Sequence, residues 1–305
     1  MKTTTLGKND LVSSRLVYGC MRIAGDNSPE DREKGRNAIR AAIAEGYTHF
    51  DHADIYGGGE CESIFSEVLA EMPGIREKLL ITDKCGIRLP DQPQAGYPKR
   101  YDFSRQHILD SVDGSLQRLG VDYMDLLLLH RPDYLFDPND VAETFRILKA
   151  SGKVRHFGVS NFRPSQLSML QAFCDEPLLV NQVEVNIHNM NTLDDGTLDQ
   201  CQQLDITPMP WCPLGGVVYA AWGNTLTEDQ SARIHAELAL QADKYAAESW
   251  IVILAWLLKH PSRMTPIIGS TRPDRIRAAK QSLELEYTAE DWYRLLQARN
   301  GAEVA

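Results

Sequence analysis

The hydrophobic positions of the chain follow a recurring pattern: a short apolar run, a polar or glycine-rich break, and then a segment with helical spacing. Runs such as DLLLL at 125–129 are apolar at almost every position, which is typical of strands buried on both faces of a parallel sheet. The pattern predicts eight strands, at residues 15–19, 48–51, 79–84, 124–130, 154–160, 178–184, 206–211 and 265–269.

The segments between these runs have the spacing of helices, and several begin at capping residues such as Ser104 and Asn139. Strands that alternate with helices pair in parallel through right-handed crossovers. Eight such units favour a closed (β/α)8 TIM barrel, although the count alone leaves an open doubly wound sheet as an alternative. The predicted helices are 30–45, 60–71, 104–119, 139–151, 164–173, 194–204 and 273–282.

The remaining segments are additions to this repeat. We expect an N-terminal β-hairpin at residues 2–13, an added helix near 229–247 and a C-terminal tail. The long loops 86–103 and 213–228 follow strands, so in a barrel they would overhang its C-terminal face. No linker rich in Pro, Gly and Ser divides the chain, and we therefore expect residues 1–305 to form a single α/β domain, with one or two extra helices.

Composition and charge narrow the function classes. The formal net charge of −10 argues against nucleic acid as a partner, since such binding needs an extended cationic surface, but leaves a local anion site open. The N-terminus has no apolar signal-peptide core, and the apolar stretch 250–258 is too short to cross a bilayer, so we expect a cytoplasmic protein without a membrane partner. Six cysteines without CxxC spacing suit reduced thiols.

Polar residues stand where several predicted strands end. Asp51 ends the second apolar run, Tyr56 lies in the loop that follows it, Lys84 ends the third run and His130 ends the fourth. In a parallel barrel all of these side chains would gather at the C-terminal mouth, where barrel enzymes keep their chemistry. The sequence therefore predicts one pocket that contains a carboxylate, a phenol, an ammonium and an imidazole.

These four groups have complementary chemistry. A tyrosine with its reference pKa of about 10 is a poor proton donor near neutrality unless a nearby cation stabilises the phenolate. Lys84 would be that cation, because an ion pair at about 4 Å is worth about 4 kcal/mol at an effective dielectric near 20. Asp51 would keep Lys84 charged and oriented, and a neutral His130 would hydrogen-bond a substrate oxygen.

Residues 50–60, FDHADIYGGGE, also allow a competing interpretation, a hydrolase metal centre. Such barrels often begin with an HxH strand, which is absent here, so we expect no bound metal. In that case His52 is a hydrogen-bonded structural histidine and Asp54 a loop or helix-cap residue. The three glycines match no phosphate-binding fingerprint and predict a permissive turn. The metal centre would comprise Asp51, His52, Asp54, His130 and His156.

Seven segments along the chain are distinctive: FDHADIYG, ITDKCG, LLLLHRPD, GKVRHFGVSNF, NQVEVN, PMPWCPLGG and IIGSTRPDR. In this order they resemble the successive signatures of the aldo-keto reductase superfamily, and the likeness covers nearly the whole chain. The strings HADIYGG, KCGI, KVRHFGVSNF and DGTLDQ also resemble the bacterial YdhF-type oxidoreductases within it.

The resemblance implies an NADPH-dependent reductase of aldehydes and ketones on a (β/α)8 barrel, with Asp51, Tyr56, Lys84 and His130 as catalytic residues and Tyr56 as the general acid. The implied partner is a small-molecule carbonyl substrate, and a monomer is the default, with an oligomer left open. The implied cofactor contacts are Gly19, Met21 and Arg22 beside the cofactor, Ser160, Asn161 and Gln182 on the carboxamide, Trp211 stacked on the nicotinamide, and Cys212, Leu214 and Gly216 along the pyrophosphate.

The resemblance also implies that Ser270, Thr271 and Arg275 bind the adenosine 2′-phosphate, which favours NADP over NAD. The sequence departs from the family at this end: Gly269 replaces a phosphate-binding lysine of some members. Ala278 and Ala279 replace a Glu-Asn pair that often contacts adenine, with Lys280 as an electrostatic substitute. At position 211, tryptophan stands where many relatives have tyrosine.

Simpler interpretations remain for some of these residues. Ser160 and Asn161 could cap the helix 164–173, Trp211 could be a core residue, and the cations Arg272, Arg275, Arg277 and Lys280 could form the solvated face of the last helix. At the level of function, the alternative is an NADP-binding regulatory subunit with little or no turnover, because potassium-channel β subunits resemble the same family. The aromatic residues Tyr97, Tyr101 and Phe103 indicate an aromatic wall for the substrate.

Overall fold

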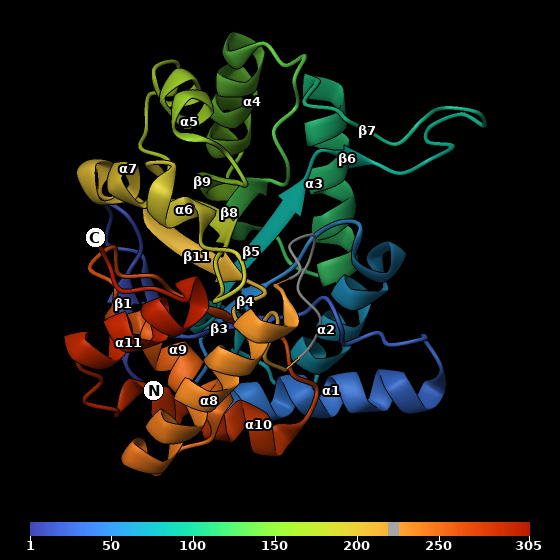
Figure 1. The fold of residues 1–305 in the computed structure, drawn as a ribbon. Coiled ribbons are helices and arrows are strands. Elements are labelled where there is room, and N and C mark those ends of the chain that lie inside the picture. The colour runs from blue at the N-terminus through green and yellow to red at the C-terminus, as the bar shows by residue number, and fades with distance from the viewer. Residues whose placement is uncertain (219–225) are drawn as a thin grey trace.

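The computed structural model of the chain describes residues 1–218 and 226–305. Eight parallel strands form one sheet in the order β11-β10-β9-β8-β5-β4-β3-β12. The two ends of this order meet where the Thr265 amide, just before β12, donates to the carbonyl of Pro208 in β11 over 2.9 Å. Helices lie around the strands (Figure 1), and the architecture is the predicted (β/α)8 barrel.

All eight predicted strands are present, with bounds close to those expected. Because the strands are parallel and in register, their carboxyl ends lie at one end of the barrel, with Asp51 beside Thr82 and Lys84 beside Leu128. The strands are β3 (Val17–Gly19), β4 (His49–Asp51), β5 (Leu80–Cys85), β8 (Met124–Leu129), β9 (Val154–Ser160), β10 (Val180–Glu184), β11 (Thr207–Trp211) and β12 (Ile267–Ile268).

Six predicted helices, the added one included, also have bounds close to those expected. The capping prediction was wrong for Asn139, because Asp137 caps that helix. Ser104 does occupy the N-cap position of its helix as predicted, but its hydroxyl donates to Asp102 over 2.6 Å and accepts no hydrogen bond from the helix. These helices are α1 (Pro29–Ala44), α2 (Glu60–Ala70), α3 (Arg105–Leu119), α4 (Pro138–Ala150), α5 (Pro164–Gln171) and α8 (Glu228–Tyr245).

Two predicted helices are divided. The segment 194–204 forms α6 (Asn191–Asp194) and α7 (Thr197–Leu204), because Gly196 between them has a left-handed φ of 83°. The segment 273–282 forms α10 (Pro273–Ala278) and the 3-10 turn η3 (Ala279–Leu283). A further 3-10 turn, η2 (Arg76–Lys78), precedes β5.

Two helices lie outside the predicted set. α9 (Ser249–Lys259) is the apolar stretch near 250–258, and α11 (Ala289–Asn300) lies in the expected tail. α9 is buried from Trp250 to Leu257, since α8, α11 and η3 all pack against it. A helix that is apolar on every side has no 3.6-residue hydrophobic period, which explains why the sequence pattern did not predict it. Within the described ranges, no helix has both the length and the apolar character of a membrane span.

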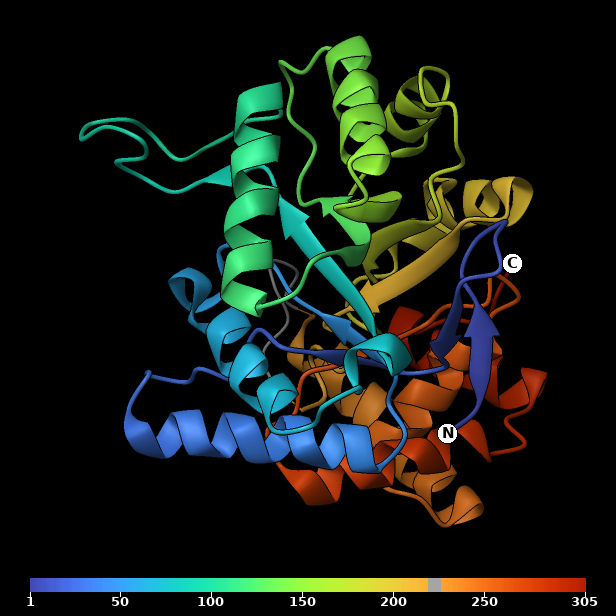
Figure 2. The ribbon, with the colours of Figure 1, turned by 180° about the vertical axis from the view of Figure 1, so that it is seen from behind.

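The predicted N-terminal hairpin is present and covers the end of the barrel at which the strands begin. β1 (Thr3–Thr5) and β2 (Val12–Ser14) pair antiparallel, and Leu6 between them is fully buried among the residues of the barrel interior. The Gly7 amide donates to the Thr207 hydroxyl, at the start of β11, over 2.8 Å. Figure 2 shows the hairpin on the same side of the molecule as both chain ends. The opposite end of the barrel, where the strands finish, is left for the site.

The two long predicted loops differ in how much of them is described. Within 86–103, β6 (Ile87–Arg88) and β7 (Arg100–Tyr101) form an antiparallel pair whose connecting arm extends away from the barrel (Figure 1). In the loop 213–228, residues 219–225 lie outside the described residues.

The burial of Leu6 in the hairpin predicts an effect on the free energy of unfolding. Leu6→Ala should lower the free energy of unfolding by about 2–5 kcal/mol, as expected for a leucine removed from a packed core. The control is Leu240→Ala on α8, whose leucine is 67% exposed and should cost less than about 0.5 kcal/mol. Urea unfolding monitored by circular dichroism measures both, and equal costs would show that the hairpin does not belong to the core.

Candidate active site

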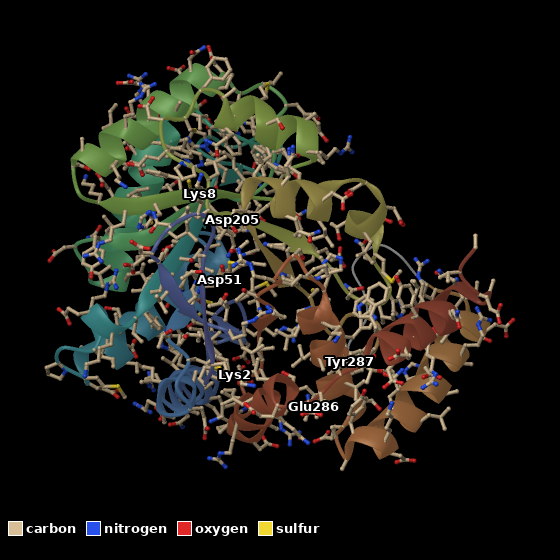
Figure 3. All side chains as sticks on the ribbon, turned by 90° about the vertical axis from the view of Figure 1, so that its left-hand side faces the viewer. Lys2, Lys8, Asp51, Asp205, Glu286 and Tyr287 are labelled. Carbon is tan, nitrogen blue, oxygen red and sulfur yellow. The ribbon has the colours of Figure 1, made fainter. Side chains whose placement is uncertain are left out.

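The centre of the site is an ion pair between Asp51 and Lys84. The Lys84 ammonium donates to both carboxylate oxygens over 2.8 Å and to the backbone carbonyl of His52 over 2.6 Å. Gln182 donates to the same carboxylate over 2.8 Å. Both charged residues are buried, with 2% and 1% exposure, and Figure 3 shows Asp51 in the interior of the molecule. Such a pair is stable only because hydrogen bonds replace the water that burial removes.

A glycine turn brings Tyr56 to this pair. Tyr56 begins the 3-10 turn η1 (Tyr56–Gly59), and its amide donates to the Ala53 carbonyl over 3.0 Å. Gly57, Gly58 and Gly59 have φ values of 59°, 66° and 95°, a backbone region that residues other than glycine rarely adopt. The glycines therefore form the permissive turn that the sequence predicts, and this turn connects the end of β4 to α2.

The four residues predicted to meet do lie together. The Lys84 ammonium is 5.0 Å from the centre of the Tyr56 ring, and the Tyr56 and His130 rings meet edge to face with centroids 6.0 Å apart. The backbone amide of His130 donates to the Cys85 carbonyl over 2.9 Å, which places His130 beside the end of β5. The carboxylate, phenol, ammonium and imidazole thus share one end of the barrel.

Burial keeps Tyr56 protonated at neutral pH. Burial raises the pKa of Tyr56 to about 12, although the Lys84 charge and a hydrogen bond from Lys84 act to lower it. The expected influence of Lys84 is present, but burial outweighs it. Burial acts to lower the pKa of Lys84, yet the charge of Asp51 and its hydrogen bond, together with Tyr56 and Asp83, outweigh burial and raise that pKa. The pocket therefore contains a neutral phenol beside a permanent cation.

His130 is neutral for similar reasons. Burial, followed by the positive charges of Lys84, Arg131 and Lys99, holds the pKa of His130 well below its usual value. A neutral imidazole has one nitrogen that donates and one that accepts. His130 can therefore donate a hydrogen bond to a carbonyl oxygen without carrying a charge.

A cavity of about 630 Å³ opens over these residues at the carboxyl ends of the strands. Lys84 lies beneath its floor. Gly216 is not part of the wall, because it packs against His188, whose ring would lie 1.9 Å from any added Cβ. All other predicted site residues line it: Asp51, Tyr56, His130, Gly19, Met21, Arg22, Ser160, Asn161, Gln182, Trp211, Cys212, Leu214, Gly269, Ser270, Thr271 and Arg275.

The amide of Asn161 organises the middle of the cavity. Its oxygen accepts from the Trp211 indole over 2.9 Å, and its nitrogen donates to the Ser160 hydroxyl over 2.8 Å and to the His130 carbonyl over 3.2 Å. Ser160 and Asn161 do not cap α5, because Arg163 occupies that position. Trp211 is half-buried on the cavity wall rather than in the core, and Asn161 fixes its ring.

The cations near β12 are not equivalent. Arg272 pairs with Asp274 over 2.6 Å, and Glu45 at the end of α1 pairs with both Arg277 and Lys280. In the described part of the chain Arg275 lines the cavity without an ion pair. Lys280 is therefore held by Glu45, and its substitution for an adenine contact stays a prediction.

Two residues of the FDHADIYGGGE stretch are structural. His52 packs edge-on against Phe65 at 4.7 Å, and within the described residues neither of its ring nitrogens has a hydrogen-bond partner, so the hydrogen-bonded role predicted for it was wrong. Burial, followed by the Lys84 charge, lowers the pKa of His52 to about 3. Asp54 lies in the loop as predicted. Among residues 1–218 and 226–305, no group of three or more histidine, cysteine or acidic side chains is arranged to hold a metal ion.

Several wall residues were not predicted. Of the three aromatic residues that indicated a substrate wall, only Tyr101 lines the cavity, since Phe103 is buried in the core and Tyr97 lies on the exposed arm. Arg131 could have been found from its position directly after a strand end, whereas Lys99 stands in a loop without any periodic signal. Ile55 and Ile87 complete this side of the wall.

Comparison with known proteins agrees with this geometry. Residues 15–300 match the sequence model of the Aldo/keto reductase family. The chain belongs to this family. It is 44% identical over 292 residues to the oxidoreductase YdhF of Escherichia coli, with 95% of each chain covered, which confirms the predicted resemblance. It is 39% identical over 295 residues to a 6-dehydroglucose reductase of Agrobacterium fabrum, with 96% of each chain covered.

A solved structure agrees with the fold of this aldo/keto reductase. The aldo-keto reductase of Bombyx mori in complex with NADP superposes with a TM-score of 0.77 at 25% identity. The match covers 98% of this chain and 93% of that one. The likeness therefore spans the barrel together with the hairpin and the added helices.

The buried ion pair predicts a coupled stability effect. Lys84→Met leaves the Asp51 carboxylate buried without its counter-ion and should lower the free energy of unfolding by about 3–5 kcal/mol. The double variant Asp51→Asn with Lys84→Met should cost less than the two single changes added together, because no charge is then left unpaired. Urea unfolding of the four proteins completes the cycle, and simple additivity would contradict the direct pairing.

Proposed function

We propose that this aldo/keto reductase is an NADPH-dependent carbonyl reductase that converts aldehydes and ketones to alcohols, with Tyr56 as the general acid. One observation carries the proposal: a protonated phenol and a neutral imidazole face the same cavity, beside a lysine whose charge is fixed by Asp51. The relative named as a 6-dehydroglucose reductase supports the reductive direction.

The residues of the cavity wall support nicotinamide adenine dinucleotide phosphate, NADP(H), as the cofactor. Its wall runs from Tyr56 past Trp211 to Arg275, and the space beside Gly269 is open, since an added Cβ would meet only the Gly19 carbonyl at 4.0 Å. At that end Ser270 and Thr271 offer hydroxyl groups and Arg275 a guanidinium, which suits a phosphate. The NADP complex of the Bombyx mori relative supports NADP(H) as the cofactor.

We place the cofactor with its nicotinamide over Trp211 and its adenosine phosphate at Arg275. Asn161 fixes the indole ring, and Gln182 joins this side of the cavity to Asp51 through its amide nitrogen. Bound NADPH would supply the hydride. The carbonyl group of the substrate would then lie over Tyr56 and His130.

The protein's part in the reaction is to hold the carbonyl and deliver a proton. His130 donates a hydrogen bond to the carbonyl oxygen, which orients it and stabilises the charge that develops there. Tyr56 gives its proton to that oxygen as the alcohol forms. Lys84, charged because of Asp51, stabilises the phenolate that remains, and this offsets the raised pKa of Tyr56 at the moment when the proton leaves.

The assigned acid can be tested by removing one hydroxyl. Tyr56→Phe should lower kcat for reduction of a panel of aldehydes by about 100-fold or more while the dissociation constant of NADPH changes little. NADPH oxidation at 340 nm and quenching of tryptophan fluorescence measure the two quantities. The control is Tyr97→Phe on the exposed arm, which should match the wild type. Equal turnover in Tyr56→Phe would reject this acid, and NADPH binding without turnover of any carbonyl by the wild type would favour the regulatory alternative.

The choice between NADP and NAD depends on Arg275. Arg275→Ala should weaken NADPH binding by about tenfold to 100-fold, the usual effect of losing a hydrogen bond to a charged group, and should leave NADH binding nearly unchanged. Arg277→Ala is the matched control, because Arg277 pairs with Glu45. Fluorescence titration gives the dissociation constants of both cofactors for the wild type and the two variants. Equal losses for the two cofactors would remove the assignment of the 2′-phosphate.

A further inference from the structure

Two cations on the cavity wall have no place in the proposed cofactor contacts. Lys99 and Arg131 both line the cavity, and neither forms an ion pair within the described residues. Arg131 directly follows His130, and its guanidinium lies 5.2 Å from the centre of the Trp211 ring. Arg131 therefore lies on the cavity wall beside Trp211 and next in sequence to His130.

These cations lie across the barrel from the proposed phosphate site. Arg131 follows β8, and Lys99 comes from the arm that follows β5, the neighbour of β8 in the sheet. Ser270 and Arg275 follow β12, which is four strands away from β8 in a ring of eight. The cavity thus has two cationic sides on opposite edges of the mouth. A cofactor phosphate bound beside β12 leaves the cations beside β8 unused.

The side chain of Lys99 is oriented by the arm that connects β6 to β7. Side chains alternate along an extended chain, so Lys99 and Tyr101 share one side of this segment and Arg100 takes the other. Lys99 and Tyr101 line the cavity, whereas Arg100 donates to the Gln92 carbonyl over 2.7 Å and covers the Tyr97 ring at 5.2 Å. The arm therefore directs Lys99 toward the cavity, whereas Arg100 contacts other residues of the arm.

Within residues 1–218 and 226–305, no carboxylate forms an ion pair with these cations. Among the described residues of the cavity wall, Asp51 is the only acidic one, and its oxygens are bound by Lys84 and Gln182. The chain as a whole carries a formal net charge of −10, so the positive charge of the cavity mouth is opposite in sign to the net charge of the protein. A concave site lined by charges of one sign concentrates ligands of the opposite sign.

We propose that Lys99 and Arg131 form an anion-binding subsite for the substrate, and that the preferred substrates are carbonyl compounds that carry a carboxylate or phosphate group a few atoms from the carbonyl. The carbon skeleton between the two groups would lie against the apolar side chains of Ile55, Ile87 and Tyr101. This inference rests on the proposed reductase function, because it places the anion relative to a carbonyl held by Tyr56 and His130.

The test compares substrates that differ only in charge. Wild-type kcat/KM should be about tenfold or more higher for 4-carboxybenzaldehyde than for its methyl ester, methyl 4-formylbenzoate, mainly through KM. The ester group withdraws electrons more strongly than the carboxylate, so a preference for the acid does not arise from intrinsic reactivity. A second pair, glyceraldehyde 3-phosphate and glyceraldehyde, shows whether the subsite takes a phosphate.

Variants connect the preference to the two residues. Lys99→Met and Arg131→Met should each lower kcat/KM for the acid by about tenfold and leave the ester nearly unchanged. Lys99→Arg and Arg131→Lys keep the charge and should restore most of the preference. Lys8→Met is the matched control, because Lys8 lies in the hairpin at the closed end of the barrel (Figure 3) and should have no effect.

The outcomes separate the inference from the function on which it rests. Turnover of the ester equal to or better than that of the acid, or a preference for the acid that survives both methionine variants, would overturn the subsite and leave the reductase standing. Failure to reduce either aldehyde would count against the reductase function. In that case calorimetry with 4-(hydroxymethyl)benzoate in the presence of NADP⁺ decides on the subsite: binding that Lys99→Met and Arg131→Met weaken supports it, and no binding to the wild type overturns it.

Discussion

The charge on Lys84 is the constraint on which the candidate site depends. An ammonium with almost no exposed surface keeps its proton only if anions and dipoles replace its water, and here Asp51 and the His52 carbonyl do so. These partners come from the end of the neighbouring strand, so the pair exists only when β4 and β5 lie side by side in register. The charge in turn acts on the acidities of Tyr56 and His130, which approach it from two further segments.

The two ends of the barrel differ in chemistry, because the N-terminal hairpin covers one end and a cavity lies over the other. At the lower end, Leu6 and the hairpin complete an apolar interior, so packing rather than chemistry determines which residues fit there. At the upper end the strands finish in polar side chains, and the loops leave a cavity above them. The cavity is therefore anchored on rigid strand ends, while its outer edge is formed by longer connections.

Most of the barrel could be predicted from the sequence, because parallel strands buried on both faces appear as continuous apolar runs. The grouping of Asp51, Tyr56, Lys84 and His130 followed from the same pattern, since a strand end fixes where a side chain lies. α9 could not be predicted in this way, because a helix buried on all sides has no amphipathic period. Lys99 was missed because the course of a long loop is set by tertiary contacts, and His52 was misjudged because ring packing leaves no signal in a single sequence.

The tryptophan at position 211 has a consequence for the amide beside it. An indole nitrogen can only donate a hydrogen bond, so the oxygen of Asn161 must face Trp211, and its nitrogen must then face the His130 carbonyl. A tyrosine hydroxyl both donates and accepts, and would be compatible with either rotation of that amide. The aromatic residue at the end of β11 thus fixes the orientation of the amide that directly follows β9. The hydrogen bonds from Trp211 through Asn161 to the His130 carbonyl therefore run in a single donor-to-acceptor direction.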